Sequence, residues 1–492
     1  MKALFSRFRF KRSSPKALIP ATLTAGTILV VVALFVLQTP IFDTIELNWL
    51  DLRFRTRGKI APSPNVVLAV IDERSLGSEG RWPWPRSKFA ALIDVLSRDG
   101  AKVIGFDVTF AESEDNAQLA LINGFARTVD SLAIDNPKLS DFIQDSRAKA
   151  DNDRALVNAL RRSSAALVLG YFFHMDEAAV GYKLDKADIE RRLSGIGASK
   201  YPLVYSEEQA DGASPFIKSY APQGNLDLFA AAAASTGYFT IVSDPDGRVR
   251  WLPLMIQGGE DLFPPLSILC VWHYLGKPQL AVRTDAYGVE GVQMGDRFIP
   301  TDESGQLLIN YRGPPQTFAH YSISDILGGR LPPGTFADKI VIVGATALGI
   351  GDIRSTPFSP VYPGPEIHAS VIDNILAGDF IEKPRWSMVF DLSAIVLLSS
   401  VVGIALPRIS ALKGVLVVAG IAGFYVVAAY ELFAHGDRGR ARALRVIRLL
   451  NRRSENRHQL VTDIVGERAT ICEHLFRHPV VVIAQDLDYR AW

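Results

Sequence analysis

The stretch that decides the fold is Val66–Asp107, with the sequence VVLAVIDERSLGSEGRWPWPRSKFAALIDVLSRDGAKVIGFD. It begins with Val66–Ile71, an unbroken apolar run rich in β-branched residues and typical of a buried strand. Apolar residues then recur at helical spacing over Arg86–Leu96, and a second short apolar run follows at Val103–Phe106. A strand, a helix and a strand in this order predict a βαβ unit with parallel strands.

The same alternation continues over residues 65–387. Further strands are predicted at Ala166–Phe172, Gly237–Val242, Leu307–Tyr311 and Ile340–Val343, and helices near Asp151–Ser163, Pro265–Leu275 and Ile367–Leu376. This alternation predicts an α/β domain whose mixed or mostly parallel sheet is flanked by helices. The pattern is weak over residues 112–150 and 176–224, where we expect insertions or mobile loops.

The composition excludes several classes of protein. With 48% hydrophobic residues, 21% charged residues and a net charge of +1, the 492-residue chain is neither a disordered polymer nor a polycation, and no nucleic-acid partner is expected. Cys270 and Cys472 are the only cysteines, which rules out a disulfide framework. Cys270 lies in an apolar helical run and is predicted to be buried.

Apolar segments near both ends predict membrane anchoring. A basic segment, residues 1–16, precedes an uncharged apolar run at 17–37, which predicts a cytoplasmic N-terminus and an uncleaved transmembrane anchor. Residues 38–387 are then expected outside the cytoplasm. Two further spans are predicted at 388–406 and 414–434, with a basic link that favours the cytoplasm. The expected location is a bacterial cytoplasmic membrane, with several spans.

The tail, residues 435–492, conflicts with this topology. Three spans would place it outside the cytoplasm, yet it opens with a dense run of arginines, which favours the cytoplasmic side. A shifted reading frame or a truncated gene would produce such a change, and a basic amphipathic helix over 441–465 is the alternative reading. Cys472, His474 and His478 lack the fourth ligand that a structural zinc site requires, so no metal site is predicted.

Two groups of polar residues follow predicted strands. Asp72 and Asp107 come directly after the first two strands, where ligands collect in parallel sheets, and could face one crevice, although a role in capping helices or fixing turns is favoured for both. Between them, the Trp82-Pro83-Trp84-Pro85 run opens the helix that begins at Arg86, and a packing role is favoured for it.

The later landmarks are turns and a glycine-rich loop. Ser243–Arg250 contains Asp246-Gly247, which predicts a hairpin, and it lacks the later glutamate of a calcium loop. The loop Gly344–Asp352 has no Lys-Ser or Lys-Thr, which excludes a Walker A phosphate loop. Glu366 and His368 follow it and could join a ligand site, although a helix cap or an internal histidine is the favoured interpretation.

In this order, the landmarks resemble the CHASE class 2 domain, the second class of cyclases/histidine kinases associated sensory extracellular domains. The resemblance rests on Ile71-Asp72, Trp82-Pro83-Trp84-Pro85-Arg86, Gly105-Phe106-Asp107, Asp246-Gly247 with Arg250, Asn310-Tyr311-Arg312-Gly313, Val343-Gly344 with Asp352, and Pro363-Gly364 with Glu366, His368 and Ala369. It implies extracytoplasmic sensing coupled to a cyclase, a histidine kinase, a diguanylate cyclase or a Ser/Thr kinase. The family brings no agreed ligand. Candidate ligand-binding residues are Asp72, Arg86, Asp107, Asp352, Glu366 and His368.

The leading functional hypothesis is a membrane-anchored sensor that has no catalytic domain of its own and needs no cofactor. The alternative is an adenylate or guanylate cyclase whose catalytic part is missing from this chain. No Gly-x-Ser-x-Gly elbow or His-Glu-x-x-His helix supports a hydrolase, so no catalytic residue is assigned. Expected partners are the membrane, an extracytoplasmic stimulus, a second copy of the chain and a separate cytoplasmic effector. The helix Ile367–Leu376, followed by Pro384, is the candidate lever to the membrane.

Overall fold

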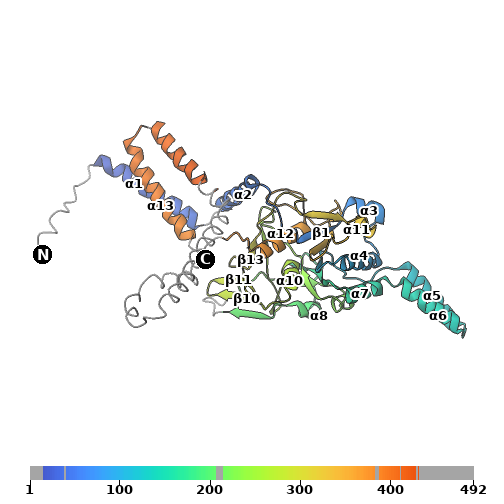
Figure 1. The fold of residues 1–492 in the computed structure, drawn as a ribbon. Helices are drawn as coiled ribbons and strands as arrows, with labels where there is room; N and C mark the ends of the chain where they lie inside the picture. Colours follow the sequence, from blue (N-terminus) through green and yellow to red (C-terminus); the bar gives the residue numbers. More distant parts are fainter. Residues whose placement is uncertain are drawn as a thin grey trace, which may run out of the picture. The chain divides into compact units, whose positions relative to one another are not determined.

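A seven-stranded sheet forms the centre of the α/β domain (Figure 1). The computed structural model describes residues 15–37, 40–206, 214–382, 387–410, 412–427 and 430. The strand order is β14-β1-β15-β2-β3-β5, and β6 also pairs with β3. The strands are β1 Val66–Ile71, β2 Val103–Phe106, β3 Ala166–His174, β5 Ala221–Gln223, β6 Ser235–Tyr238, β14 Ala319–Ser322 and β15 Ile340–Ala345. All pairs in this sheet are parallel except β3 with β5.

The predicted mixed, mostly parallel sheet is therefore confirmed. The predicted βαβ unit is present, but β15 lies between β1 and β2, so its two strands are not neighbours. The strand predicted at Gly237–Val242 begins and ends earlier, as β6. The strand predicted at Leu307–Tyr311 is only β13, Gln306–Leu308, which pairs with β7, Trp251–Pro253.

Helices cover both faces of this sheet. On one face, α4 Arg86–Arg98 and α7 Asn152–Arg162 pack over alternate strand residues, and a large buried apolar cluster lies between these helices and the sheet. On the other face lie α10 Leu266–Tyr274 and α12 Gly364–Ala377. A Cβ at Gly105 of β2 would lie 2.6 Å from the Cys270 sulfur of α10, so this strand position must be glycine for the helix to pack so closely. Cys270 is buried, as predicted.

A second, four-stranded sheet was not predicted. Its order is β12 Arg297–Pro300, β11 Gly288–Met294, β10 Leu280–Asp285 and β4 Leu203–Ser206. Gly288 and Gly291 of β11 have positive φ angles, and these glycines interrupt the apolar run that would have marked a strand. Two short hairpins complete the strands, namely β8 Ile256–Gly258 with β9 Asp261–Phe263, and β16 Ile353–Arg354 with β17 Tyr362–Pro363.

The two segments expected to be insertions or mobile loops contain regular structure, which makes the loop prediction wrong. Residues 112–150 form two helices, α5 Ala117–Ser131 and α6 Pro137–Ala150, and residues 176–224 include α8 Lys186–Ile196, η1 Gly197–Ser199, β4 and β5. The α5–α6 pair buries only a small apolar cluster of its own, so its apolar stripe is too narrow to show clearly in the sequence. The remaining short helices are α3 Glu73–Glu79, α9 Asp227–Ala230, α11 Ile323–Leu327 and η2 Leu406–Arg408.

The hairpin predicted at Ser243–Arg250 is a turn without paired flanking strands. Gly247 has φ +78° and donates its backbone N–H to the Asp244 carbonyl at 2.8 Å, so the Asp-Gly turn itself is present. The Asp244 N–H also donates across the turn to the Arg248 carbonyl at 2.8 Å. Beyond this pair the chain bonds elsewhere, since the Val249 N–H donates to the Ser355 carbonyl at 2.8 Å and β6 and β7 pair with other strands. The prediction of a hairpin is therefore wrong, while the prediction of a turn is confirmed.

The apolar segments form helices α1 Pro15–Val36, α13 Ser387–Ala405 and Leu412–Val427. Among the described residues, one helix, Met388–Arg408, is long and apolar enough to cross a membrane, with a mean hydropathy of 2.3. The described apolar parts of the other two predicted spans are shorter, Thr22–Val36 and Leu412–Val427, so several spans stay a prediction. α1 packs along α13, where a Cβ at Gly403 would lie 2.2 Å from the Thr24 methyl carbon.

The chain divides into two units, Met1–Gly414 and Val415–Trp492. All strands and all helices up to α13 belong to the first unit. The predictions for the tail, residues 435–492, including Cys472, His474 and His478, lie outside the described residues, as does the basic segment up to residue 14.

Candidate functional site

Asp72 follows β1 at the carboxyl edge of the main sheet and caps helix α3. Its carboxylate accepts hydrogen bonds from the Ser75 backbone N–H and from the Ser322 hydroxyl, each at 2.8 Å. Burial raises the pKa of this carboxyl, but the hydrogen bonds to its charged form outweigh burial, so the pKa of Asp72 lies below its ordinary value. Asp72 therefore has the capping role that the sequence left open beside ligand binding.

Asp107 follows β2 at the same edge and lies near a second carboxylate. Its backbone N–H donates to the Val343 carbonyl of β15 at 2.8 Å. The Asp352 carboxylate forms an ion pair with Arg354, whose Nε lies 2.8 Å from it. The negative charge of Asp352 also acts on Asp107. Burial first, and then the charge of Asp352, raise the pKa of Asp107 to about 8. Two carboxylates and one guanidinium thus share this edge, and we call Asp107 and Asp352 the carboxylate pair.

Helix α12 begins against the carboxylate pair. A Cβ at Gly344 would lie 2.3 Å from Pro365 Cγ and 3.2 Å from Asp107 Cβ, so the start of the helix, the end of β15 and Asp107 are in direct contact. The Gly364 N–H donates to the Asp352 carbonyl at 2.8 Å. The structure therefore brings together Asp107, Gly344, Asp352 and Gly364, four residues that the sequence singled out in three separate motifs.

Asp107→Asn is expected to remove part of the pH dependence of stability. Between the ordinary pKa of 3.8 and the folded value of about 8, the unfolded chain releases a proton that the folded chain retains, so rising pH favours unfolding. Asparagine has no proton to release. The variant should match the wild type near about pH 4 and exceed its free energy of unfolding by about 1–3 kcal/mol near about pH 8, since Asp107 is partly exposed and solvent screens the effect.

Thermal unfolding of the full chain in detergent micelles across this pH range measures the difference. Asp352→Asn is the companion variant, and because it removes the neighbouring charge, it should move the pH-dependent loss of stability to lower pH. Parallel pH profiles for the wild type and Asp107→Asn would contradict the prediction.

Glu366 and His368 lie on α12 and face the interior. The Glu366 carboxylate accepts hydrogen bonds from the backbone N–H groups of Gln316 at 3.0 Å and Thr317 at 2.9 Å, which fixes the loop before β14. Burial raises the pKa of Glu366, opposed by His320 and by these N–H donors. Burial lowers the pKa of His368 to about 4, so its imidazole is neutral. Both side chains are fully buried, and their predicted place at a ligand site is not supported by this geometry.

Arg86 and the tryptophans before it are held by protein contacts. Arg86 Nε lies 3.1 Å from Asp153 Oδ1, and its guanidinium lies over the Phe110 ring. Trp82 packs edge to face against Trp84 and against Phe89 of α4, and Trp84 packs on Phe89 with tilted rings. The packing role favoured for the Trp-Pro run is confirmed, and Arg86 ties α4 to the start of α7.

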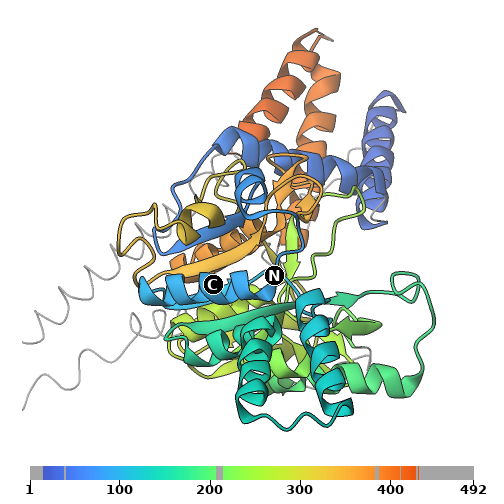
Figure 2. The ribbon, with the colours of Figure 1, turned by 90° about the vertical axis from the view of Figure 1, so that its right-hand side faces the viewer.

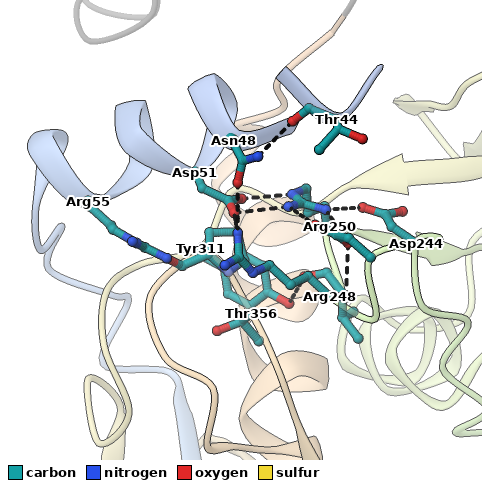
Figure 3. A network of polar contacts seen from close by, with 12 residues as sticks. Thr44, Asn48, Asp51, Arg55, Asp244, Arg248, Arg250, Tyr311 and Thr356 are labelled. Carbon is teal, nitrogen blue, oxygen red and sulfur yellow. Dashed lines mark hydrogen bonds and ion pairs between the residues drawn. The ribbon is translucent and has the colours of Figure 1, made fainter. Parts of the chain in front are cut away.

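Helix α2, Pro40–Arg57, follows α1, and its Asp51 binds arginines that come directly after the turn at Asp246-Gly247 (Figure 3). Asp51 accepts hydrogen bonds from Arg250 Nε at 2.7 Å and from a terminal nitrogen of Arg250 at 2.9 Å. The other side of the same guanidinium bonds Asp244 at 2.6 Å and Asp246 at 2.8 Å, and Arg248 also donates to Asp51. One arginine therefore joins α2 to the turn through three carboxylates.

Charge balance explains why this arginine can be buried. The Arg250 side chain is 0% exposed and Asp51 is 3% exposed, and two charges removed from water in this way need close, well-oriented partners. Burial lowers the pKa of Arg250, but hydrogen bonds to Asp246, Asp51 and Asp244 outweigh it, and the net shift is upward. Burial raises the pKa of Asp244, whereas the hydrogen bond from Arg250 lowers that of Asp246.

The segment Ile309–Arg312 lies next to this network and contacts helices α2 and α12. We call it the junction segment. On the α2 side, Arg57 donates to the Asn310 side-chain oxygen and to the Tyr311 carbonyl, both at 2.6 Å. The Ile309 N–H donates to the Arg250 carbonyl at 2.9 Å. Figure 2 shows α2, in blue, beside yellow and orange segments of the α/β domain.

On the α12 side, the contacts are equally direct. Asn374 of α12 exchanges two hydrogen bonds with the backbone of Asn310, at 2.9 Å and 3.0 Å. Arg312 Nε donates to Asp373 at 2.5 Å, and the same guanidinium donates to Asp379 beyond the end of the helix. The Arg312 and Asp373 side chains are 3% and 2% exposed. The junction segment thus connects the helix that follows α1 with the helix that precedes α13.

Sequence reasoning missed most of this junction. It quoted Arg250 and Asn310-Tyr311-Arg312 as motif residues but assigned them no partners, and it predicted no helix over residues 40–57. A signal was available at Asp51, an acidic residue between apolar neighbours in Trp49-Leu50-Asp51-Leu52, because a charge on an apolar helix face usually marks a buried partner.

Among the described residues, no three His, Cys, Asp or Glu side chains lie close enough together to hold a metal ion. A family model described as the CHASE2 domain matches residues 27–406. No curated protein and no solved structure matches the chain. The match covers the junction, the carboxylate pair and helices α2 to α13, and it confirms the resemblance drawn from the sequence motifs.

Proposed function

Because the chain belongs to the CHASE2 domain family, a family of extracellular sensory domains, we propose that it is a membrane-anchored receptor of a bacterial signalling system. Its α/β domain receives a stimulus outside the cytoplasm, and helices next to the membrane relay it. A separate effector on the cytoplasmic side receives the signal. The proposal assigns reception and relay to these residues and no catalysis.

The observation that carries the proposal is the double attachment of the junction segment. α2 follows the apolar helix α1, α12 precedes the apolar helix α13, and both are bonded to Ile309–Arg312. A ligand shifts a receptor only by binding one of two states more tightly than the other. A segment that bonds both membrane-adjoining helices is well placed to convert a shift of either helix into a shift of the other.

Helix α12 links this junction to the carboxyl edge of the sheet. It starts at the carboxylate pair and ends with Asp373 and Asn374 in the junction. With 14 residues, it spans about 21 Å at 1.5 Å per residue. The lever predicted at Ile367–Leu376 is the body of this helix, and the predicted hinge at Pro384 lies outside the described residues. A stimulus that altered the spacing of Asp107 and Asp352 would act on the first turn of α12.

The test of the proposal is the side of the membrane on which the α/β domain lies. Ser78→Cys on exposed α3, in a Cys472→Ala background, should react with a membrane-impermeant maleimide in intact cells. Cys270 is fully buried and should stay silent. The matched control is Lys11→Cys in the basic N-terminal segment, which should react only after lysis. Labelling of Ser78→Cys only after lysis would place the domain in the cytoplasm and overturn the proposal.

A further inference from the structure

Helices α5 and α6 form a hairpin that extends from the α/β domain beyond α7 (Figure 1). Asn116 caps α5 by accepting the Leu119 N–H at 3.0 Å, and it closes the base of the hairpin by donating to the Ala150 carbonyl at 2.6 Å. The two helices share a small buried cluster built on Ala126, Val129 and Ile143. The hairpin is therefore an ordered arm that packs chiefly on itself.

One face of α5 carries apolar side chains that no described part of the chain covers. Leu121, Phe125 and Leu132 are 76%, 52% and 65% exposed. Together with Thr128, they stand at intervals of four, three and four residues, the spacing of a coiled-coil seam. Such a seam places its residues on one stripe of the helix, which is the geometry for pairing with another helix.

We propose that this stripe, Leu121, Phe125, Thr128 and Leu132, pairs with the same stripe of a second copy of this chain, side by side in the membrane. A two-fold axis between Phe125 and Thr128, with the helices antiparallel, places Leu121 against Leu132 of the second copy. It also places the large Phe125 ring against the small Thr128 side chain. The stripe is thus complementary to itself, which is the requirement of a symmetric dimer contact.

The charges of the arm fit the same partner. Residues 117–150 carry four basic side chains, Arg127, Lys138, Arg147 and Lys149, and four acidic ones, Asp130, Asp135, Asp141 and Asp145. Two copies of a neutral arm approach without net repulsion. A strongly basic or acidic partner would gain nothing from this charge pattern.

The size of the stripe argues for a partner already held nearby. Helix α5 has 15 residues and is about 22 Å long, so the stripe buries far less than the roughly 800 Å² per partner of a stable interface between free proteins. Two chains anchored in one membrane meet at a high effective concentration, which makes a small contact sufficient. In this respect the inference rests on the membrane anchoring proposed above.

Cysteine crosslinking in membranes tests the contact. In the full chain with Cys472→Ala, Thr128→Cys beside the two-fold axis should form a dimer with a short membrane-impermeant bismaleimide added to intact cells. Adding Leu121→Ser, or Leu132→Ser at the paired position, should lower the crosslinked fraction by about tenfold, because an apolar contact is lost on both sides of the axis. The matched control is Leu348→Ser, a leucine 70% exposed on another loop, which should change nothing.

The outcomes separate this inference from the proposed function. Crosslinking that is absent in intact cells but present, and sensitive to Leu121→Ser, in opened membranes would support the contact and refute the exterior location. Crosslinking that Leu121→Ser and Leu132→Ser leave unchanged would overturn the contact, as would crosslinking at Lys149→Cys but not at Thr128→Cys. Failure to crosslink in either preparation, with Ser78→Cys labelled in intact cells, would overturn the contact and leave the receptor in place.

Discussion

Replacing Arg250 with methionine is expected to lower the free energy of unfolding by about 3–5 kcal/mol, because the variant leaves buried carboxylates without their counter-charge. Asp51 would keep only Arg248, and Asp244 would lose its guanidinium partner altogether. Since Asp51 is the residue through which α2 binds Arg250, the same change should release α2 from the domain. The loss should shrink at low pH, where protonation neutralises the orphaned carboxylates.

Chemical unfolding of the full chain in detergent micelles measures the first effect, and amide hydrogen exchange over residues 43–57 measures the release of α2. The matched control is Arg74→Met, the same substitution in an ion pair with Asp325 whose arginine is 61% exposed. It should cost about 1 kcal/mol or less, as exposed ion pairs do. Equal losses in the two variants would show that the buried network has no special role in holding α2.

Replacing Arg312 with methionine is expected to loosen both helices that the junction segment connects. The variant leaves the buried Asp373 carboxylate without a counter-charge, with the Ser63 N–H still bonded to it, and removes the guanidinium from Asp379, so the end of α12 should open more readily, by about 3–5 kcal/mol locally. Because the junction segment also accepts the hydrogen bonds of Arg57, its disturbance should reach α2. Amide exchange in nanodiscs should therefore rise by at least about tenfold at the end of α12 and also in α2.

Arg297→Met is the matched control for this relay. Arg297 donates to the Ile375 and Leu376 carbonyls at 3.2 Å and 3.0 Å, so it also contacts the end of α12, but it comes from β12 rather than from the junction segment. Its loss should raise exchange at the end of α12 and leave α2 unchanged. If Arg312→Met also left α2 unchanged, the two helices would be independent, and the relay through Ile309–Arg312 would be wrong.

Neither Arg250 nor Arg312 was predicted from the sequence as a functional residue. Arg250 and Arg312 both stood in motifs that resemble the family, yet the functional candidates were chosen by a different rule, that ligands collect after parallel strands. The rule predicted that Asp72 and Asp107 could face one crevice, whereas the structure places the Asp352 charge beside Asp107 and uses Asp72 as a helix cap. It could not decide between a ligand site and a helix cap for Asp72, or between a ligand site and an internal position for Glu366 and His368, because whether a polar side chain points into a crevice or into the protein depends on the packing around it.

The sequence by itself determined the elements that depend on local pattern. Runs such as Val66–Ile71 and Ile340–Val343 are short and rich in β-branched residues, which favours buried strands, and Arg86–Leu96 has one apolar face, so the α/β class and most of the main sheet followed from local pattern. Only the tertiary structure decided which charges meet. Asp51 and Arg250 are 199 residues apart, and Arg57 and Asn310 are 253 apart. A charge can be buried only where an opposite charge reaches it, and the fold of the intervening chain sets that position, so no local pattern in the sequence contains it.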